Sequence, residues 1–111
     1  MNQTDRFAEI IATYSKYGWQ LRRVLMRPET RAEASGREHA LFAHAPVDEA
    51  TVDALWFSRP SHAGREAWEL RLVAEAPYAL FEAFEADETE EEREDVRHEM
   101  EARMREYVSQ S

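Results

Sequence analysis

The residues best suited to chemistry in this sequence lie at the tip of a predicted hairpin. Arg59, His62 and Arg65 occur within seven residues, spaced by serine, proline and glycine. Guanidinium and imidazole groups beside hydroxyl and amide donors are suited to holding a carboxylate or a phosphate. Two structural interpretations compete with this one. The proline and glycine shape a soluble turn, or the arginines neutralise the acidic start of the last helix. The structural interpretations are favoured.

The same stretch lacks the pattern of a catalytic or metal site. Ser58 or Ser61, with His62 and Asp53, supplies the residue types of a hydrolase triad, but no G-x-S-x-G elbow is present. A solvated turn is also a poor place to hold a base in position. The four histidines lack metal-ligand spacing, and the absence of cysteine excludes thiolate sites and disulfides. We therefore expect no metal and no cofactor, and favour a non-enzymatic protein.

Charge limits the partners of the chain, which has 111 residues and a net charge of −9. Residues 1–81 carry ten basic and eleven acidic side chains, whereas residues 82–111 carry four and twelve. This acidic field repels phosphate backbones and anionic membranes, so we expect no nucleic-acid and no membrane partner. The first residues contain no apolar run long enough for a signal peptide or a membrane span. The sequence thus predicts a soluble, cytoplasmic protein, and its arginine-, alanine- and glutamate-rich composition suggests a bacterial source.

Apolar periodicity predicts a helix near each end of the chain. The first predicted helix covers residues 4–17, with apolar side chains at helical spacing. The last begins with a capping box of Thr89 and Glu92 and has one narrow apolar stripe that includes Met100 and Met104. Strands are predicted at residues 19–27, 39–44, 54–58, 68–72 and 78–85; residues 28–38 are predicted as a loop and the segment after Pro46 as one helical turn.

Two of these strands are expected to form the hairpin whose tip was described above. Both runs alternate apolar and polar residues and are bounded by proline and glycine. Pairing Phe57 with Trp68 and Leu55 with Leu70 places these apolar side chains on one face. The prediction is one domain over residues 1–111, of the α+β class. It has an antiparallel-rich sheet of four to five strands, and both terminal helices pack on one face.

The predicted second face of the sheet suggests an interface. In the expected register, Trp56 points away from the helices, beside Arg71, Glu69 and Phe81. Aromatic residues interleaved with charged ones are typical of an interface core, although a more closed sheet would bury both faces within one chain. The leading hypothesis is a protein-interaction module that acts as a homodimer, with Arg59, His62 and Arg65 at its rim.

Two alternatives stay open beside the homodimer. One is a secretion-type chaperone or adaptor, which shares the small size, the acidity and the α+β composition. The other is a protein or enzyme that binds a small anionic ligand in a pocket between helix and sheet. There Arg23, Arg59 or His62 would orient the ligand, because a buried arginine needs an anionic partner.

Overall fold

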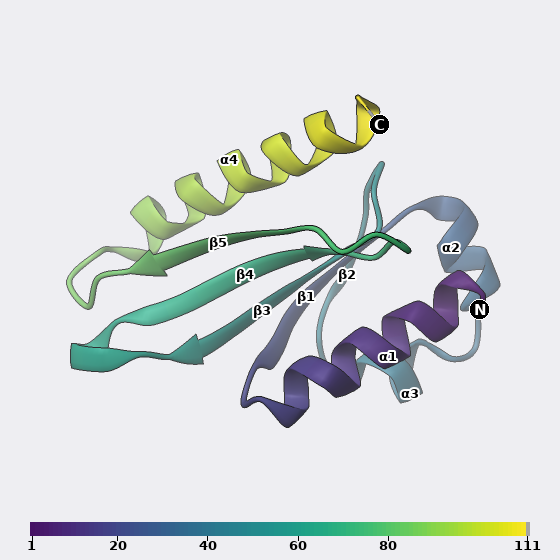
Figure 1. The fold of residues 1–111 in the computed structure, drawn as a ribbon, viewed down its shortest axis with the longest axis horizontal. Coiled ribbons are helices and arrows are strands. Elements are labelled where there is room, and N and C mark those ends of the chain that lie inside the picture. The colour runs from purple at the N-terminus through teal and green to yellow at the C-terminus, as the bar shows by residue number, and fades with distance from the viewer. Residues whose placement is uncertain (111) are drawn as a thin grey trace.

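The computed structural model describes residues 1–110, which form a five-stranded sheet with four α-helices (Figure 1). In chain order the elements are α1 (Gln3–Lys16), β1 (Gln20–Met26), α2 (Pro28–Glu33), α3 (Glu38–Phe42), β2 (Val47–Glu49), β3 (Ala54–Pro60), the 3₁₀ turn η1 (His62–Gly64), β4 (Glu66–Leu72), β5 (Ala79–Phe84) and α4 (Glu90–Ser109). The strand order is β2-β1-β3-β4-β5. Only β1 and β2 pair in parallel, so the expected α+β class with a mostly antiparallel sheet is confirmed.

The two long helices cover opposite faces of this sheet, and the expectation that both lie on one face is wrong. Phe7 and Ile10 of α1 belong to a core with Leu55 and Phe57 of β3. On the other face, Met100 and Met104 of α4 pack in a second core, whose strand residues include Trp56, Trp68, Leu70 and Leu72. Figure 1 shows α1 and α4 on the two sides of the sheet. Each helix thus has its own apolar surface to bury.

The predicted hairpin exists, but its predicted register is wrong by one residue. Trp56 pairs with Leu70, and Phe57 pairs with Glu69. The cause is that residues 54–58 are buried on both faces. Apolar alternation selects a register only where one face of a strand is exposed to solvent. In a central strand both alternating sets are apolar, and the pattern does not distinguish them.

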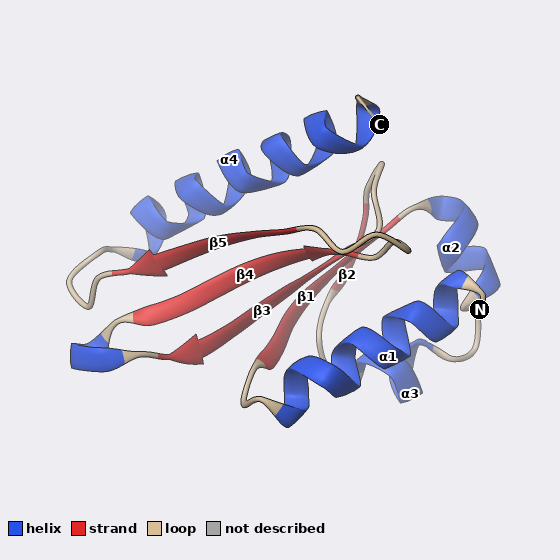
Figure 2. Cartoon of the chain, in the orientation of Figure 1, coloured by secondary structure: helices blue, strands red, loops and turns tan. Residues whose placement is uncertain are grey.

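The segment between β1 and β3 also differs from the prediction. Residues 28–38 contain α2 and the start of α3, residues 39–44 are largely helical instead of extended, and β2 replaces the expected helical turn. Pro28 occupies the first turn of α2, where its missing N–H leaves no hydrogen bond unmade. Figure 2 shows both short helices beside α1, away from α4. Elements of five or six residues are too short to display a helical period.

Helix α4 begins where the sequence predicts. The Thr89 side chain accepts a hydrogen bond from the Glu92 backbone N–H, and the Glu92 carboxylate accepts one from the Thr89 N–H. This capping box satisfies two of the free donors at the helix start. It fixes the position of the glutamates and the arginine that the next turns of α4 present to the sheet.

Candidate functional site

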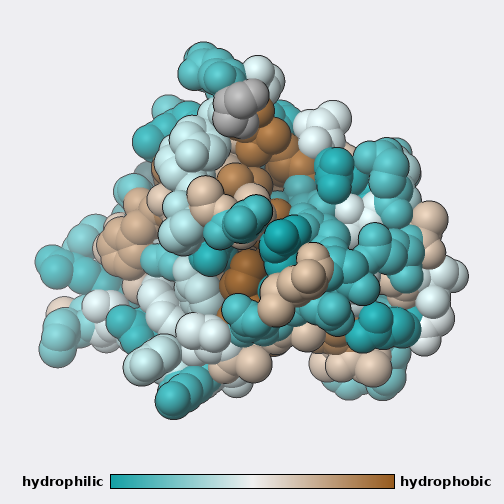
Figure 3. Space-filling model, turned by 45° about the vertical axis from the view of Figure 1, so that its right-hand side comes forward, coloured by the Kyte–Doolittle hydropathy of each residue, from teal (hydrophilic) through white to brown (hydrophobic). Residues whose placement is uncertain are grey.

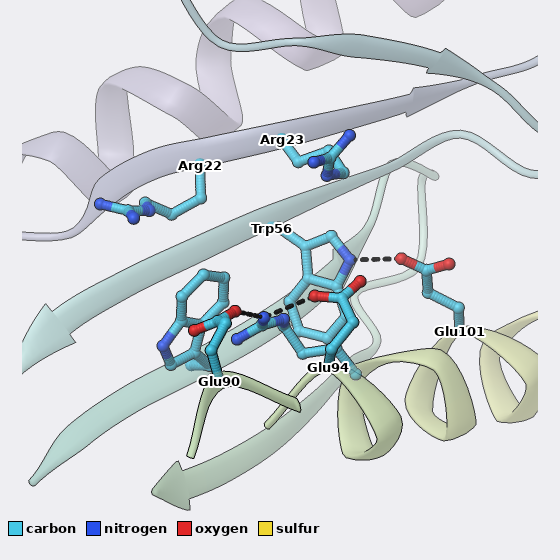
Figure 4. Close-up of a pocket in the computed structure, with 8 residues that line it drawn as sticks. Arg22, Arg23, Trp56, Glu90, Glu94 and Glu101 are labelled. Atoms are coloured by element: carbon cyan, nitrogen blue, oxygen red, sulfur yellow. Dashed lines mark hydrogen bonds and ion pairs between the residues drawn. The ribbon is translucent and has the colours of Figure 1, made fainter. Parts of the chain in front are cut away.

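A pocket of about 180 Å³ lies between the start of α4 and the sheet (Figure 4). We call it the α4 pocket, and its lining residues are Arg22, Arg23, Trp56, Trp68, Glu90, Glu94, Arg97 and Glu101. The lining thus consists of three arginines, three glutamates and two tryptophans. Such a composition is suited to binding charged groups over an aromatic floor.

The two neighbouring arginines reach the α4 pocket together because β1 contains a bulge. Leu21 pairs with Phe57 and Arg23 pairs with Trp56, which leaves Arg22 as an extra residue in β1. The Arg22 guanidinium lies 5.4 Å from the centre of the Trp68 ring, on the same face as Arg23. In a regular strand, consecutive side chains point to opposite faces. The bulge is therefore what gives the pocket two cations from adjacent positions.

The floor of the α4 pocket is formed by two indoles that are held in place. The Trp56 and Trp68 rings meet edge to face, with their centres 5.9 Å apart. The Trp56 Nε1–H donates to Glu101 Oε2 at 2.8 Å, and the Trp68 Nε1–H donates to Glu66 Oε1 at 2.5 Å. Each indole N–H is satisfied, so the floor is polar only at its edges and fixed in orientation.

Arg97 is the central charge of the α4 pocket and is only 7% exposed. Its guanidinium lies 4.5 Å from the centre of the Trp68 ring, and its Nη2 donates to Glu94 at 2.6 Å and to Glu90. Its Nη1 is buried and has no hydrogen-bond partner among residues 1–110. A buried donor without an acceptor loses its solvation without replacement, which costs about 1–3 kcal/mol. Arg97 therefore keeps one buried donor unused within the wall of the pocket that it lines.

The charges around Arg97 stabilise one another. Burial acts to lower the pKa of Arg97, but the hydrogen bonds to Glu94 and Glu90 outweigh burial and raise it. The hydrogen bond from Arg97 lowers the pKa of Glu94, and the charges of Arg97, His98 and Arg23 lower it further. Both groups are thus ionised at neutral pH, and the pocket is a set of fixed charges.

Apart from Arg97, which pairs with Glu90 and Glu94 on α4 itself, the charges of the α4 pocket are divided between two walls. Arg22 and Arg23 come from β1, whereas Glu90, Glu94 and Glu101 come from α4 on the opposite side (Figure 4). Within residues 1–110, no ion pair joins the two arginines of β1 to these glutamates. Arg23 instead pairs with Asp48 of β2 at 2.6 Å, and Arg22 lies over the Trp68 ring.

A second buried ionic cluster, around Asp53, differs from that of Arg97 in its hydrogen bonding. Asp53 is 3% exposed and accepts hydrogen bonds from the Gln3 side chain, the Thr30 hydroxyl, and both the backbone N–H and the Nε of Arg27. These bonds connect α1, the start of α2 and the residue that precedes β3. Each carboxylate oxygen is used, and the structure records no unpartnered donor here. The Asp53 cluster therefore holds these segments of the chain together.

The predicted site residues are spread over several parts of the fold. Arg59 donates to the Tyr17 carbonyl at 3.0 Å and lies over the Trp19 ring. Arg65 pairs with Glu85, the residue that follows β5, and within residues 1–110 it forms no ion pair with the acidic start of α4. Arg71 donates to the Leu72 carbonyl.

The other two predicted site residues, His62 and Trp56, differ in their exposure to solvent. His62 lies exposed in η1. The sequence predicted that Trp56 lies on an open face of the sheet. This prediction is wrong, because Trp56 is only 1% exposed and lies beneath α4. Of the five residues, the α4 pocket includes Trp56 alone.

Arg23 was named from the sequence as a possible ligand contact, but the other charged residues of the α4 pocket were not, although two signals point to them. Arg97 stands three and seven residues before Met100 and Met104, at the spacing of the buried stripe. The Arg22–Arg23 pair interrupts the alternation of a strand, which is a sign of a bulge. Among residues 1–110, no group of three or more His, Cys, Asp or Glu is placed to hold a metal ion. No helix there is long and apolar enough to span a bilayer.

Comparisons with known proteins do not identify a relative. No family model matches the chain, and no curated protein and no solved structure is significantly similar to it.

Proposed function

We propose that the protein is a small-molecule binding protein whose α4 pocket holds the carboxylate or other anionic group of a ligand. The supporting observation is Arg97, which lines the pocket and whose buried Nη1 has no acceptor within residues 1–110. The acceptor of a ligand would remove the penalty of that unmade hydrogen bond. The bulge at Arg22 adds a second cation that has no ion pair of its own.

The residues of the α4 pocket favour binding over chemistry. Its lining contains Arg, Glu and Trp and no serine, cysteine or histidine. Glu94 and Arg97 are ionised partners of one another, and each partner holds the pKa of the other away from neutrality. A general acid or base works best with a pKa near the working pH. We therefore propose a non-enzymatic role, in the cytoplasm of a bacterium as the composition suggests.

Calorimetric titration with propionate at low salt tests this function, because added salt screens such charges. Binding by the wild type and at least tenfold weaker binding by Arg22→Gln are expected. Arg103→Gln is the matched control, since it removes an exposed arginine elsewhere on the chain. Equal heats for all three proteins, or no heat with the wild type, would contradict the function.

A second candidate function is self-association through the edge strand β5, which keeps the homodimer hypothesis as a proposal. Phe81 is 59% exposed in the middle of β5, and β5 has a neighbour on one side only. An edge strand with a single charged residue, here Glu82, is a template for pairing. Antiparallel pairing of two copies about Phe81 would set Glu82 opposite Leu80, so no like charges would meet.

Light scattering after size-exclusion chromatography tests this association. A dimer that persists at high salt and dissociates in Phe81→Ser would support it. Tyr17→Ser is the control, because Tyr17 is similarly exposed, at 63%, on another part of the surface. A wild-type protein that stays monomeric at high concentration would contradict the homodimer. The partner to test would then be a different protein, as expected for a chaperone or an adaptor.

A further inference from the structure

We propose that the ligand of the α4 pocket is a zwitterion, a small free α-amino acid, and this inference rests on the proposed binding function. The observation behind it is that Arg22 of β1 and Glu101 of α4 line opposite walls of the pocket, and neither forms an ion pair within residues 1–110. A ligand that carries both charges can bridge the walls, whereas a simple anion uses only one of them.

The balance of charge in the α4 pocket disfavours a strongly anionic ligand. Its three arginines and three glutamates carry no net formal charge together. Arg23 is moreover already neutralised by Asp48. A phosphate dianion would lie close to the glutamates and gain little from the field, because like charges at short range repel strongly in a partly buried site. A ligand that is neutral overall but dipolar pays no such penalty.

Each end of an amino acid has a partner in the α4 pocket. The carboxylate would accept from Arg22 on the β1 wall, beside Arg97, whose buried Nη1 has no acceptor within residues 1–110. The ammonium group would face Glu101, which uses Oε2 for the Trp56 N–H and keeps a second carboxylate oxygen. An ammonium over the two indoles would also gain from their ring faces. The zwitterion thus satisfies groups that the chain leaves incompletely paired.

The size of the α4 pocket restricts the ligand further. A volume of about 180 Å³ corresponds to roughly six water molecules. Pockets for drug-sized ligands have volumes of about 300–1,000 Å³. The α4 pocket therefore suits a molecule such as alanine or glycine and is too small for a nucleotide. On the face shown in Figure 3 hydrophilic residues predominate, and the most hydrophobic residues lie mainly in a band from the centre of the view towards its top, with weakly hydrophobic patches at its sides.

The test compares alanine, propionate and ethylamine by calorimetric titration of the full chain at low salt. Alanine is expected to bind at least tenfold more tightly than propionate, and ethylamine more weakly than alanine. If propionate binds as tightly as alanine, the zwitterion is wrong and the carboxylate-binding function stands. If neither binds, both proposals fail. If ethylamine binds most tightly, the pocket is a cation site and both proposals fail as well.

Glu101→Gln identifies the acidic partner of the ammonium group. The glutamine side-chain oxygen still accepts the Trp56 N–H, so the pocket floor keeps its geometry while one negative charge is lost. The preference for alanine over propionate should fall to less than threefold in this variant. Glu99→Gln, an exposed change on the same helix, should keep the tenfold preference. An unchanged preference in Glu101→Gln would overturn the proposed position of the ammonium group and, with it, the zwitterion bridge.

Discussion

The Asp53 and Arg97 clusters both bury a charge, yet only the first is complete. Asp53 accepts four hydrogen bonds from three residues of its own chain. Arg97 uses Nη2 twice and leaves Nη1 without an acceptor inside a pocket. A buried charge that is satisfied within the chain holds elements together, whereas one with an unused donor beside a cavity is prepared for a ligand. The comparison predicts opposite consequences when each charge is removed.

The largest effect on stability is expected for Asp53→Asn. The amide adds donors where Gln3, Thr30 and Arg27 already point donors, so several hydrogen bonds are lost in a buried place. Loss of one member of a buried ionic cluster costs about 3 kcal/mol or more of unfolding free energy. Urea unfolding followed by fluorescence measures this change. A loss of less than about 1 kcal/mol in unfolding free energy would show that the Asp53 cluster does not hold these segments together.

Arg97→Met should have the reverse effect, with ligand binding lost and stability nearly kept. The partner carboxylates of Arg97 have exposed side chains, 76% for Glu90 and 49% for Glu94, so water can solvate them after the change. An apolar side chain of adaptable shape fits beside Trp68 and Phe84. We expect a change of less than about 1 kcal/mol in unfolding free energy. A loss as large as that of Asp53→Asn would place both clusters in the same structural class.

Arg22→Gln sharpens the comparison, because Arg22 belongs to the α4 pocket and to no ion pair. Its exposed side chain contributes a contact with the Trp68 ring, worth about 0.5 kcal/mol. Ligand affinity should fall about tenfold, while the midpoint of urea unfolding stays almost unchanged. A variant that unfolds much more easily would show that the bulge serves the sheet and not the pocket.

The smallest expected effect is on the free energy of unfolding at acidic pH. The hydrogen bond from Arg97 lowers the pKa of Glu94, so ionised Glu94 contributes stability above the usual glutamate pKa, about 4.3. That contribution decreases as the pH falls below this value, because the folded state must then accept a proton it binds weakly. Glu94→Gln should therefore lose slightly less stability than the wild type between pH 7 and pH 3. Urea midpoints at the two pH values measure the difference, and a steeper loss in Glu94→Gln would contradict it.

The sequence predicted the elements whose local signals agree with their surroundings. The capping box of Thr89 and Glu92 and the stripe of Met100 and Met104 marked α4, because a long helix covering one face keeps a clear period. The hairpin was predicted, but its register was not. Both faces of β3 are buried, and only the tertiary structure determines which helix covers Trp56.

The α4 pocket was harder to predict than the fold. Arg97 could have been placed on the buried face of α4 from its spacing to Met100. The bulge at Arg22 depends on which backbone groups of β1 and β3 pair, and that pairing is not encoded in a short run of side chains. The arginines of the hairpin tip stood out by composition, and the structure gives Arg59 and Arg65 partners within the chain.

The most direct test of the central claim is to observe the Arg97 guanidinium while ligand is added. In protein labelled with ¹⁵N-arginine, the Arg97 side-chain signal is identified by its loss in Arg97→Met, and that of Arg27 by its loss in Arg27→Lys. Titration with alanine should shift the Arg97 signal and leave that of Arg27, in the Asp53 cluster, unmoved. An unmoved Arg97 signal at saturating alanine, or equal shifts of both, would contradict the account.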